Sequence, residues 1–157
     1  MGLNLHTMIE MGISANSHLL IRMSGSRCNA LNGMHMTRTI SVIEDDDLFR
    51  RAVVSVIQTF GFHAVGYLNA PQFLSSLEQS PPDLILSDAQ MPGMSGFELL
   101  KQVKDMGIQA PIVLMSGSTD LFLRRTAIDL GAADYIAKPF EIHELESAIH
   151  SALRVAA

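Results

Sequence analysis

The chain has 157 residues, of which 48% are hydrophobic and 17% are charged. This composition excludes an intrinsically disordered protein and is typical of one globular domain. The formal net charge of −5 disfavours nucleic-acid contacts, because no excess of Lys and Arg is available to neutralise phosphates.

The single cysteine, Cys28, cannot form an internal disulfide, which is typical of proteins in a reducing cytoplasm. The sequence has no apolar run long enough to cross a bilayer and no signal peptide. We therefore expect a cytoplasmic protein without membrane contacts.

Residues 1–36 differ in composition from the rest of the chain. They are rich in Met, Ser, Asn, Gly and His and lack sustained helical or strand periodicity. We interpret them as a disordered extension or a non-native start, with Met36 as a candidate true start. A native targeting or docking arm is the alternative. Residues 38–155 are then expected to form one domain.

From Thr39 onward, short apolar runs alternate with amphipathic stretches. In chain order they predict a strand at 39–43, a helix at 47–60, a strand at 63–68, a helix at 69–78, a strand at 84–86, a helix at 95–105, a strand at 112–115, a helix at 119–130, a strand at 135–137 and a helix at 141–153. This alternation implies parallel strands, right-handed crossovers and helices on both faces. The predicted fold is a doubly wound α/β sheet.

Sheets of this kind bind ligands at the carboxyl ends of their strands. At those ends, the first, third, fourth and fifth predicted strands carry Glu44-Asp45-Asp46-Asp47, Ser87-Asp88, Ser116-Gly117 and Lys138-Pro139. Carboxylates gathered at one edge repel one another unless a cation compensates them, and an all-oxygen set suits Mg²⁺. With a lysine opposite the metal, such a pocket matches a phosphoryl group, and one carboxylate can act as the nucleophile.

Four segments at these strand ends resemble, in order, the receiver domain of bacterial two-component response regulators. They are VIEDD at 42–46, LILSDAQMPGMSG at 84–96, VLMSG at 113–117 and GAADYIAKPF at 131–140. The resemblance covers about residues 38–155. It implies a flavodoxin-like (βα)5 fold, similar to that of chemotaxis regulators, with a five-stranded parallel sheet in the order 2-1-3-4-5.

The resemblance also implies a role for each site residue. Asp88 would be the phosphoacceptor, taking a phosphoryl group from the phosphohistidine of a sensor histidine kinase or histidine phosphotransfer protein. The implied Mg²⁺ ligands are Glu44, Asp45, Asp88 and the main-chain carbonyl of Gln90. Glu44 stands where many members of the family have Asp, which bears on the metal geometry.

Three further residues carry roles in phosphoryl binding and switching by the same resemblance. Lys138 would bind a phosphoryl oxygen, and its peptide bond to Pro139 would be cis. Ser116 would be the switch hydroxyl and a second phosphoryl ligand, and Tyr135 would be the switch aromatic.

Phosphorylation of Asp88 adds acceptor oxygens near the end of the fourth strand, so the Ser116 hydroxyl can turn inward to donate to one of them. Tyr135 can then rotate into the vacated space and change the face formed by the fourth helix, fifth strand and fifth helix. That face is the expected docking surface for an unidentified downstream protein, or for a second copy in a homodimer. Gln90 and Ser118 are expected to tune dephosphorylation by steering the attacking water.

Other interpretations stay open at this point. Asp45, Asp46 and Asp47 can be acids at a helix N-terminus, and this is preferred for Asp46 and Asp47. The chain could be a phosphatase with an aspartyl nucleophile, or an interaction module that no longer takes phosphate. We expect a signalling switch with only self-phosphorylation and self-dephosphorylation chemistry, not an enzyme. It would be a stand-alone receiver or one excised from a longer regulator.

Two smaller motifs are expected to be structural. His143 and His150 lack the spacing of zinc proteases and are expected on a helix surface. Ser95 is expected to be a helix N-cap and not a nucleophile.

Overall fold

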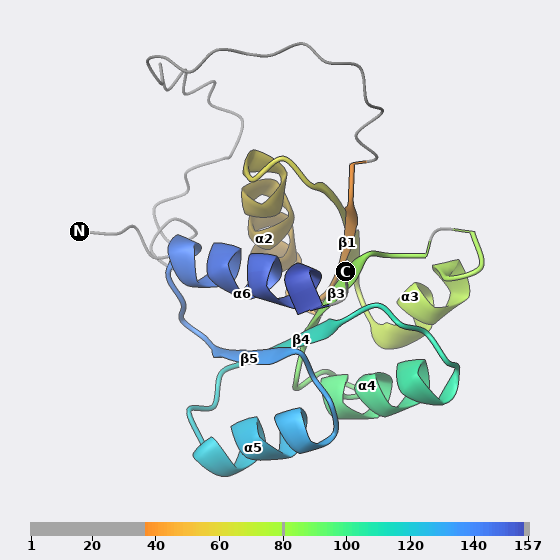
Figure 1. The fold of residues 1–157 in the computed structure, drawn as a ribbon, viewed down its shortest axis with the longest axis vertical. Helices are drawn as coiled ribbons and strands as arrows, with labels where there is room; N and C mark the ends of the chain where they lie inside the picture. Colours follow the sequence, from red (N-terminus) through yellow and green to blue (C-terminus); the bar gives the residue numbers. More distant parts are fainter. Residues whose placement is uncertain (1–36, 80, 156–157) are drawn as a thin grey trace.

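The computed structural model describes residues 37–79 and 81–155. The interpretation of residues 1–36 therefore lies outside the described residues. Within these residues a five-stranded parallel sheet has the order β2-β1-β3-β4-β5, as predicted (Figure 1). Its strands are β1 (Thr39–Ile43), β2 (His63–Tyr67), β3 (Leu84–Asp88), β4 (Ile112–Ser116) and β5 (Asp134–Ala137).

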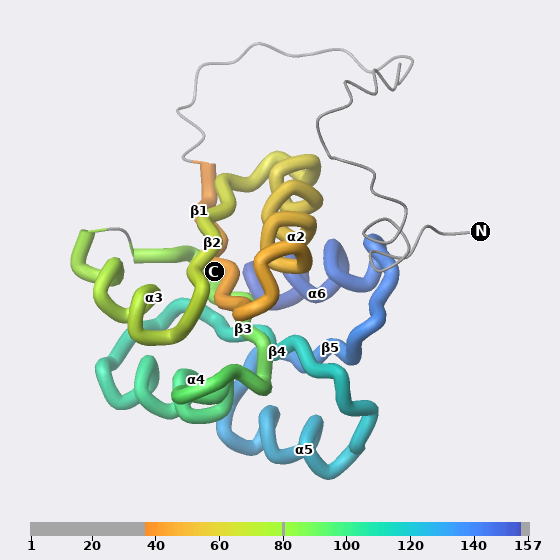
Figure 2. Tube along the Cα trace, turned by 180° about the vertical axis from the view of Figure 1, so that it is seen from behind, coloured from red at the N-terminus to blue at the C-terminus, as the bar shows by residue number. Residues whose placement is uncertain are grey.

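Helices cover both faces of the sheet, as Figures 1 and 2 show from opposite sides. In the described part of the chain they are α2 (Asp47–Thr59), α3 (Ala70–Ser76), α4 (Gly96–Asp105), α5 (Leu121–Asp129) and α6 (Ile142–Val155). Helices α2 and α6 pack on one face, and α3, α4 and α5 pack on the other. The predicted doubly wound fold is confirmed.

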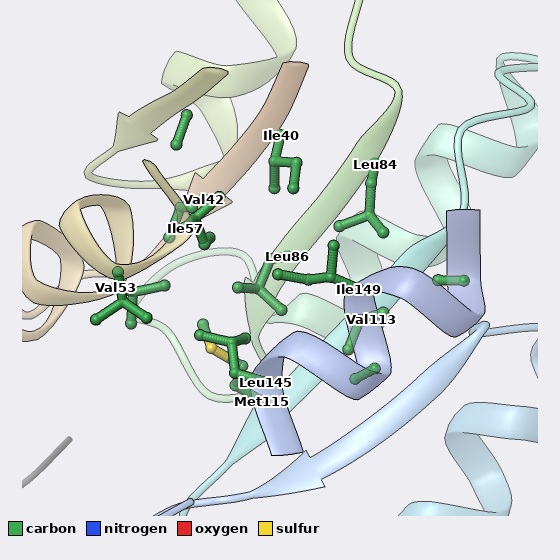
Figure 3. Close-up of a cluster of buried hydrophobic side chains, with 14 of the residues drawn as sticks. Ile40, Val42, Val53, Ile57, Leu84, Leu86, Val113, Met115, Leu145 and Ile149 are labelled. Atoms are coloured by element: carbon green, nitrogen blue, oxygen red, sulfur yellow. The ribbon is translucent and has the colours of Figure 1, made fainter. Parts of the chain in front are cut away.

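The two cores arise because successive residues of a strand point to opposite faces. Leu84 and Leu86 of β3 join the cluster under α2 and α6, whereas Ile85 between them joins the cluster on the other face. Figure 3 shows the first cluster, in which Leu145 and Ile149 of α6 lie over the β3 and β4 side chains. All five residues of β3 are buried, as expected for a strand covered on both sides.

The strand register brings the carboxyl ends of four neighbouring strands together. Ile43 pairs with Ser87, Asp88 with Met115, and Ser116 with Ala137. The residues at or just after these ends therefore meet at one edge of the sheet, where the sequence analysis expects the site.

The helices predicted at 95–105 and 119–130 begin later than predicted because a polar side chain caps each of them. The predicted helix at 119–130 begins at Leu121, since Asp120 is its N-cap and accepts a hydrogen bond from Phe122 N. The predicted helix at 95–105 begins at Gly96, with Ser95 as the expected N-cap. No helix of the described residues is long and apolar enough to cross a membrane.

Candidate functional site

Three carboxylates lie together at the carboxyl edge of the sheet. Each of Glu44, Asp45 and Asp88 offers an oxygen within 4.8 Å of those of the other two. Glu44 and Asp88 are buried, with 2% and 8% of their surface exposed, whereas Asp45 is exposed. This is the only group in the described residues with three or more potential acidic, His or Cys ligands, so His143 and His150 belong to no such group there.

Lys138 bridges the two buried carboxylates. Its Nζ lies 2.7 Å from Glu44 Oε2 and 2.6 Å from Asp88 Oδ2. The Lys138 main-chain N–H donates to the Ser116 carbonyl at 2.6 Å, and the Lys138–Pro139 peptide bond is cis. The lysine is thus fixed at its backbone to the end of β4 and at its ammonium to β1 and β3.

Burial changes the ionisation of the Glu44 carboxyl. The pKa is raised from 4.5 to about 7, mainly by this burial; the Lys138 ammonium opposes the rise, and the nearby Asp88 charge adds to it. Burial disfavours the charged form of an acid unless compensating charge is present. Lys138 pairs with two of the three carboxylates, so the cluster is deficient in positive charge.

A divalent cation would correct that deficit. The donors are all carboxylate oxygens, and two of the three acids are shielded from water, which fits a hard ion such as Mg²⁺. The Gln90 backbone also reaches the cluster, because its N–H donates to Asp88 Oδ1 at 2.9 Å. Its carbonyl, the fourth expected ligand, stays a prediction.

The loop after β1 is fixed by a residue that the sequence analysis did not single out. The Arg50 guanidinium donates to the Glu44 carbonyl at 2.7 Å and pairs with Asp47. Asp46 is the N-cap of α2 and accepts a hydrogen bond from Phe49 N at 2.9 Å. Asp46 and Asp47 therefore stabilise the helix start, as the preferred interpretation of these acids predicts.

Gly96, at the start of α4, lies against the strand that carries Asp88. A Cβ at this position would lie 2.2 Å from the Asp88 carbonyl oxygen and 2.9 Å from Ala89 Cα. The Gly96 N–H donates to the Ala89 carbonyl at 3.1 Å. Only a residue without a side chain allows this approach, a requirement that the sequence pattern alone does not reveal.

The two expected switch residues are both buried. Ser116 is fully buried, and its Oγ accepts a hydrogen bond from Ser118 N at 3.1 Å. Tyr135 is 2% exposed, and its hydroxyl donates to the Ser118 carbonyl at 3.1 Å. The turn at 116–118 thus connects both residues. In this structure Tyr135 already lies inside, while the Ser116 hydroxyl bonds to its own turn and not to Asp88.

Next to Ser116 lies an open cavity of about 530 Å³. Its walls come from the loop after β3, the start of α4, the end of β4 and α5, and they include Gln90, Met91 and Leu123. The cavity gives side chains on this side of the site room to rearrange.

Comparisons with known proteins agree with this geometry. Residues 40–150 match the model of the response regulator receiver domain family. The chain belongs to this family. The predicted resemblance is therefore confirmed, and the receiver domain is that of two-component response regulators.

Relatives of this receiver domain include longer regulators. It is 35% identical to the response regulator protein TodT of Pseudomonas putida over 125 residues, 78% of this chain and 55% of TodT. It is 38% identical to the transcriptional regulatory protein FixJ of Bradyrhizobium diazoefficiens over 117 residues, 74% of this chain and 57% of FixJ. The chain thus spans about half the length of these relatives.

The fold agrees with a solved receiver structure. That of FixJ-N superposes with a TM-score of 0.70 at 29% identity, over 74% of this chain and 94% of FixJ-N. The likeness supports the sheet order and the position of the carboxyl edge described above.

Proposed function

We propose that Asp88 accepts a phosphoryl group from the phosphohistidine of a sensor histidine kinase or a histidine phosphotransfer protein, with Mg²⁺ as cofactor. The observation that carries the proposal is the contact of Lys138 Nζ with both Asp88 and Glu44 beside the cluster of three carboxylates. A candidate nucleophile, a fixed cation and a set of potential metal ligands would thus meet at one point.

In the proposed transfer, a carboxylate oxygen of Asp88 attacks phosphorus. The new O–P bond forms as the N–P bond of the phosphohistidine breaks, and the histidine nitrogen leaves with the electron pair. Glu44, Asp45, Asp88 and the Gln90 carbonyl would hold Mg²⁺, which would neutralise charge on the phosphoryl oxygens. Lys138, already within hydrogen-bond distance of Asp88 Oδ2, would bind a phosphoryl oxygen.

Phosphorylation would then act on the turn at 116–118. The Ser116 hydroxyl would exchange its bond to Ser118 N for one to a phosphoryl oxygen. Because Tyr135 bonds to the Ser118 carbonyl, this exchange would change the packing of Tyr135 and of the surface formed by α5, β5 and α6. Gln90 and Ser118 would tune dephosphorylation.

The surface of α5, β5 and α6 is the proposed docking site for a downstream protein or for a second copy. On α5, Leu121 is 79% exposed and Phe122 is 73% exposed, which suits a partner with an apolar contact region. The proposal includes a cytoplasmic location and no nucleic-acid contacts by this domain. One relative is named as the DNA-binding transcriptional regulator NtrC of Escherichia coli, but only 24% of its length is matched. Its name therefore does not argue for nucleic-acid contacts by this domain.

We further propose a switch without turnover of external substrates. An aspartyl phosphatase would need a second acid two residues after Asp45, but Asp47 pairs with Arg50 and is outside the acid cluster. Failure to release phosphate catalytically from a small phosphomonoester would support the switch.

The first test is incubation with Mg²⁺ and acetyl phosphate, followed by intact-mass measurement of the wild type and of Asp88→Asn. We expect a Mg²⁺-dependent phosphoryl adduct on the wild type alone. No adduct on the wild type, together with no beryllofluoride binding, would contradict the proposal and favour a phosphate-independent interaction module.

A further inference from the structure

We propose that Phe49 is a positioning residue for Lys138, and that its ring face holds the ammonium where a phosphoryl oxygen on Asp88 can be bound. The inference rests on the proposed function and adds a residue to that site. Lys138 Nζ lies 4.5 Å from the centroid of the Phe49 ring. At that distance the negative face of an aromatic ring attracts a cation.

Phe49 also contacts the chain segment that carries the lysine. Its ring packs edge-to-face on Phe140, with centroids 5.8 Å apart and an interplanar angle of 74°. Phe140 is 2% exposed and follows the Lys138–Pro139 pair directly. One side chain in the first turn of α2 therefore contacts both the ammonium and the buried ring of Phe140, two residues after the lysine.

Such a contact is useful because Lys138 must change partners during phosphorylation. In the unphosphorylated protein its ammonium is shared between Glu44 and Asp88, and its side chain is 18% exposed. A phosphoryl oxygen would replace a carboxylate oxygen as its partner, and a flexible lysine could instead move toward water. The Phe49 ring carries no net charge. It can therefore restrain the ammonium while competing less strongly with the phosphoryl oxygen than a further carboxylate would.

A direct test of the contact is the chemical shift of the Lys138 side-chain Hε protons. Because they lie near the ring face, we expect them upfield of those of other lysines in the wild type. The upfield shift should vanish in Phe49→Leu and persist in Phe49→Tyr. Phe60→Leu is the matched control: Phe60 lies at the other end of α2, is also partly buried, and packs on the same cluster as Phe49.

The second test measures phosphoryl uptake from acetyl phosphate and the affinity for beryllofluoride. Loss of one cation–ring contact should lower the uptake rate by about three- to thirtyfold in Phe49→Leu. Phe49→Tyr and Phe60→Leu should remain close to the wild type. Pentafluorophenylalanine at position 49 keeps the ring shape but reverses the charge on its face, so it should slow uptake even though the fold is preserved.

The outcomes separate this inference from the proposed function. Uptake by the wild type, with Phe49→Leu no slower than Phe60→Leu, would overturn the inference alone. Wild-type-like uptake with pentafluorophenylalanine would also overturn it, since shape and not the charge of the ring would then matter. An absent upfield shift in the wild type would refute the contact. If the shift is present but the wild type takes up neither phosphoryl group nor beryllofluoride, the proposed function fails, and the role of Phe49 fails with it.

Discussion

Asp88 is held by a separate contact at each of its oxygen atoms. Its Oδ2 accepts from Lys138 Nζ, its Oδ1 accepts from Gln90 N, and its carbonyl oxygen accepts from Ser87 Oγ at 3.0 Å. The same carbonyl lies against Gly96. A carboxylate held in this way is oriented before any phosphoryl donor arrives, which lowers the entropy lost in the reaction.

We predict that Gly96→Ala destabilises the domain and slows phosphoryl uptake. The new Cβ would meet backbone atoms, at 2.2 Å from the Asp88 carbonyl oxygen, so no side-chain rotation can relieve the clash. Overpacking of this kind typically costs about 1–3 kcal/mol. Urea unfolding measures the loss, and Gly117→Ala is the control because a Cβ there meets nothing within 4 Å. Equal stability of the two variants would contradict the close approach.

At this scale the sequence predicts the residues that carry charge but not the residues that position them. Glu44, Asp88 and Lys138 follow from their places at strand ends, because the topology alone brings those ends together. The roles of Arg50 and Gly96 depend on how closely α2 and α4 approach the sheet, which is a matter of packing distance. The inward position of Tyr135 is equally unpredictable, since the sequence is compatible with either orientation.

Among the elements, α4 and α5 are joined at their carboxyl ends by one lysine. Lys104 of α4 donates from Nζ to the carbonyl of Leu130, the C-cap of α5, at 2.8 Å. A cation at a helix C-terminus is favourable because the last carbonyls carry partial negative charge. The next residue, Gly131, has φ +88°, the left-handed conformation that favours glycine after a helix.

We predict that Gly131→Ala lowers the free energy of unfolding by about 1–2 kcal/mol, because alanine disfavours the left-handed backbone. Loss of the Lys104 contact should lower it further. A Cβ at this position would lie where Lys104 Nζ now lies, at 1.7 Å. Gly107→Ala isolates the backbone part, because Gly107 has φ +74° but no atom within 4 Å of an added Cβ. Urea unfolding should show a larger loss for Gly131→Ala than for Gly107→Ala. The excess should disappear when both are made in Lys104→Ala.

The start of α4 supplies a pH-dependent contribution to stability. Hydrogen bonds from the Ser95 main-chain N–H and hydroxyl to the carboxylate lower the pKa of Glu98 from its ordinary value of 4.5. With a folded pKa below the unfolded one, the contribution is present above pH 4.5 and is lost as pH falls through the folded pKa.

We therefore predict that Glu98→Gln is less stable than the wild type near neutral pH, and that the difference shrinks in acid. Thermal unfolding of both proteins, from neutral pH to below pH 4.5, measures this difference in stability. In a Ser95→Ala background, which removes one of the two partners, the effect of Glu98→Gln should be smaller. A difference that is independent of pH would show that the charge of Glu98 is not involved.

For the whole molecule, the sequence predicts the fold better than any single boundary. Five strands alternating with five helices permit few arrangements, since crossovers are right-handed and apolar strands must be covered on both faces. The strand order itself is implied by the resemblance to receiver domains, and it is the observed one. The observed helix ends differ from the predicted ones by a residue or two, because capping residues such as Asp120 decide where a helix begins. A capped end and a helix extended by a residue or two differ little in free energy.

The charge balance of the site leads to a prediction for the stability of the whole domain. Three carboxylates lie together, and Lys138 pairs with only two of them. A bound divalent cation should therefore stabilise the folded state, because the three acids meet only in that state. At a Mg²⁺ concentration of about 100 times Kd, the free energy of unfolding should rise by about 2.7 kcal/mol. Thermal unfolding with and without Mg²⁺, at equal ionic strength, measures this.

Asp45→Asn should remove most of that Mg²⁺ response, because it deletes one of the three ligands. It should leave the metal-free domain no less stable than the wild type, since Asp45 is exposed and its loss lowers the repulsion among the acids. Asp129→Asn is the control: this exposed acid of α5 lies outside the cluster, so its Mg²⁺ response should equal that of the wild type. A response that persists in Asp45→Asn, or that is weakened equally in Asp129→Asn, would mean that Mg²⁺ acts as a general counterion and not at the carboxyl edge of the sheet.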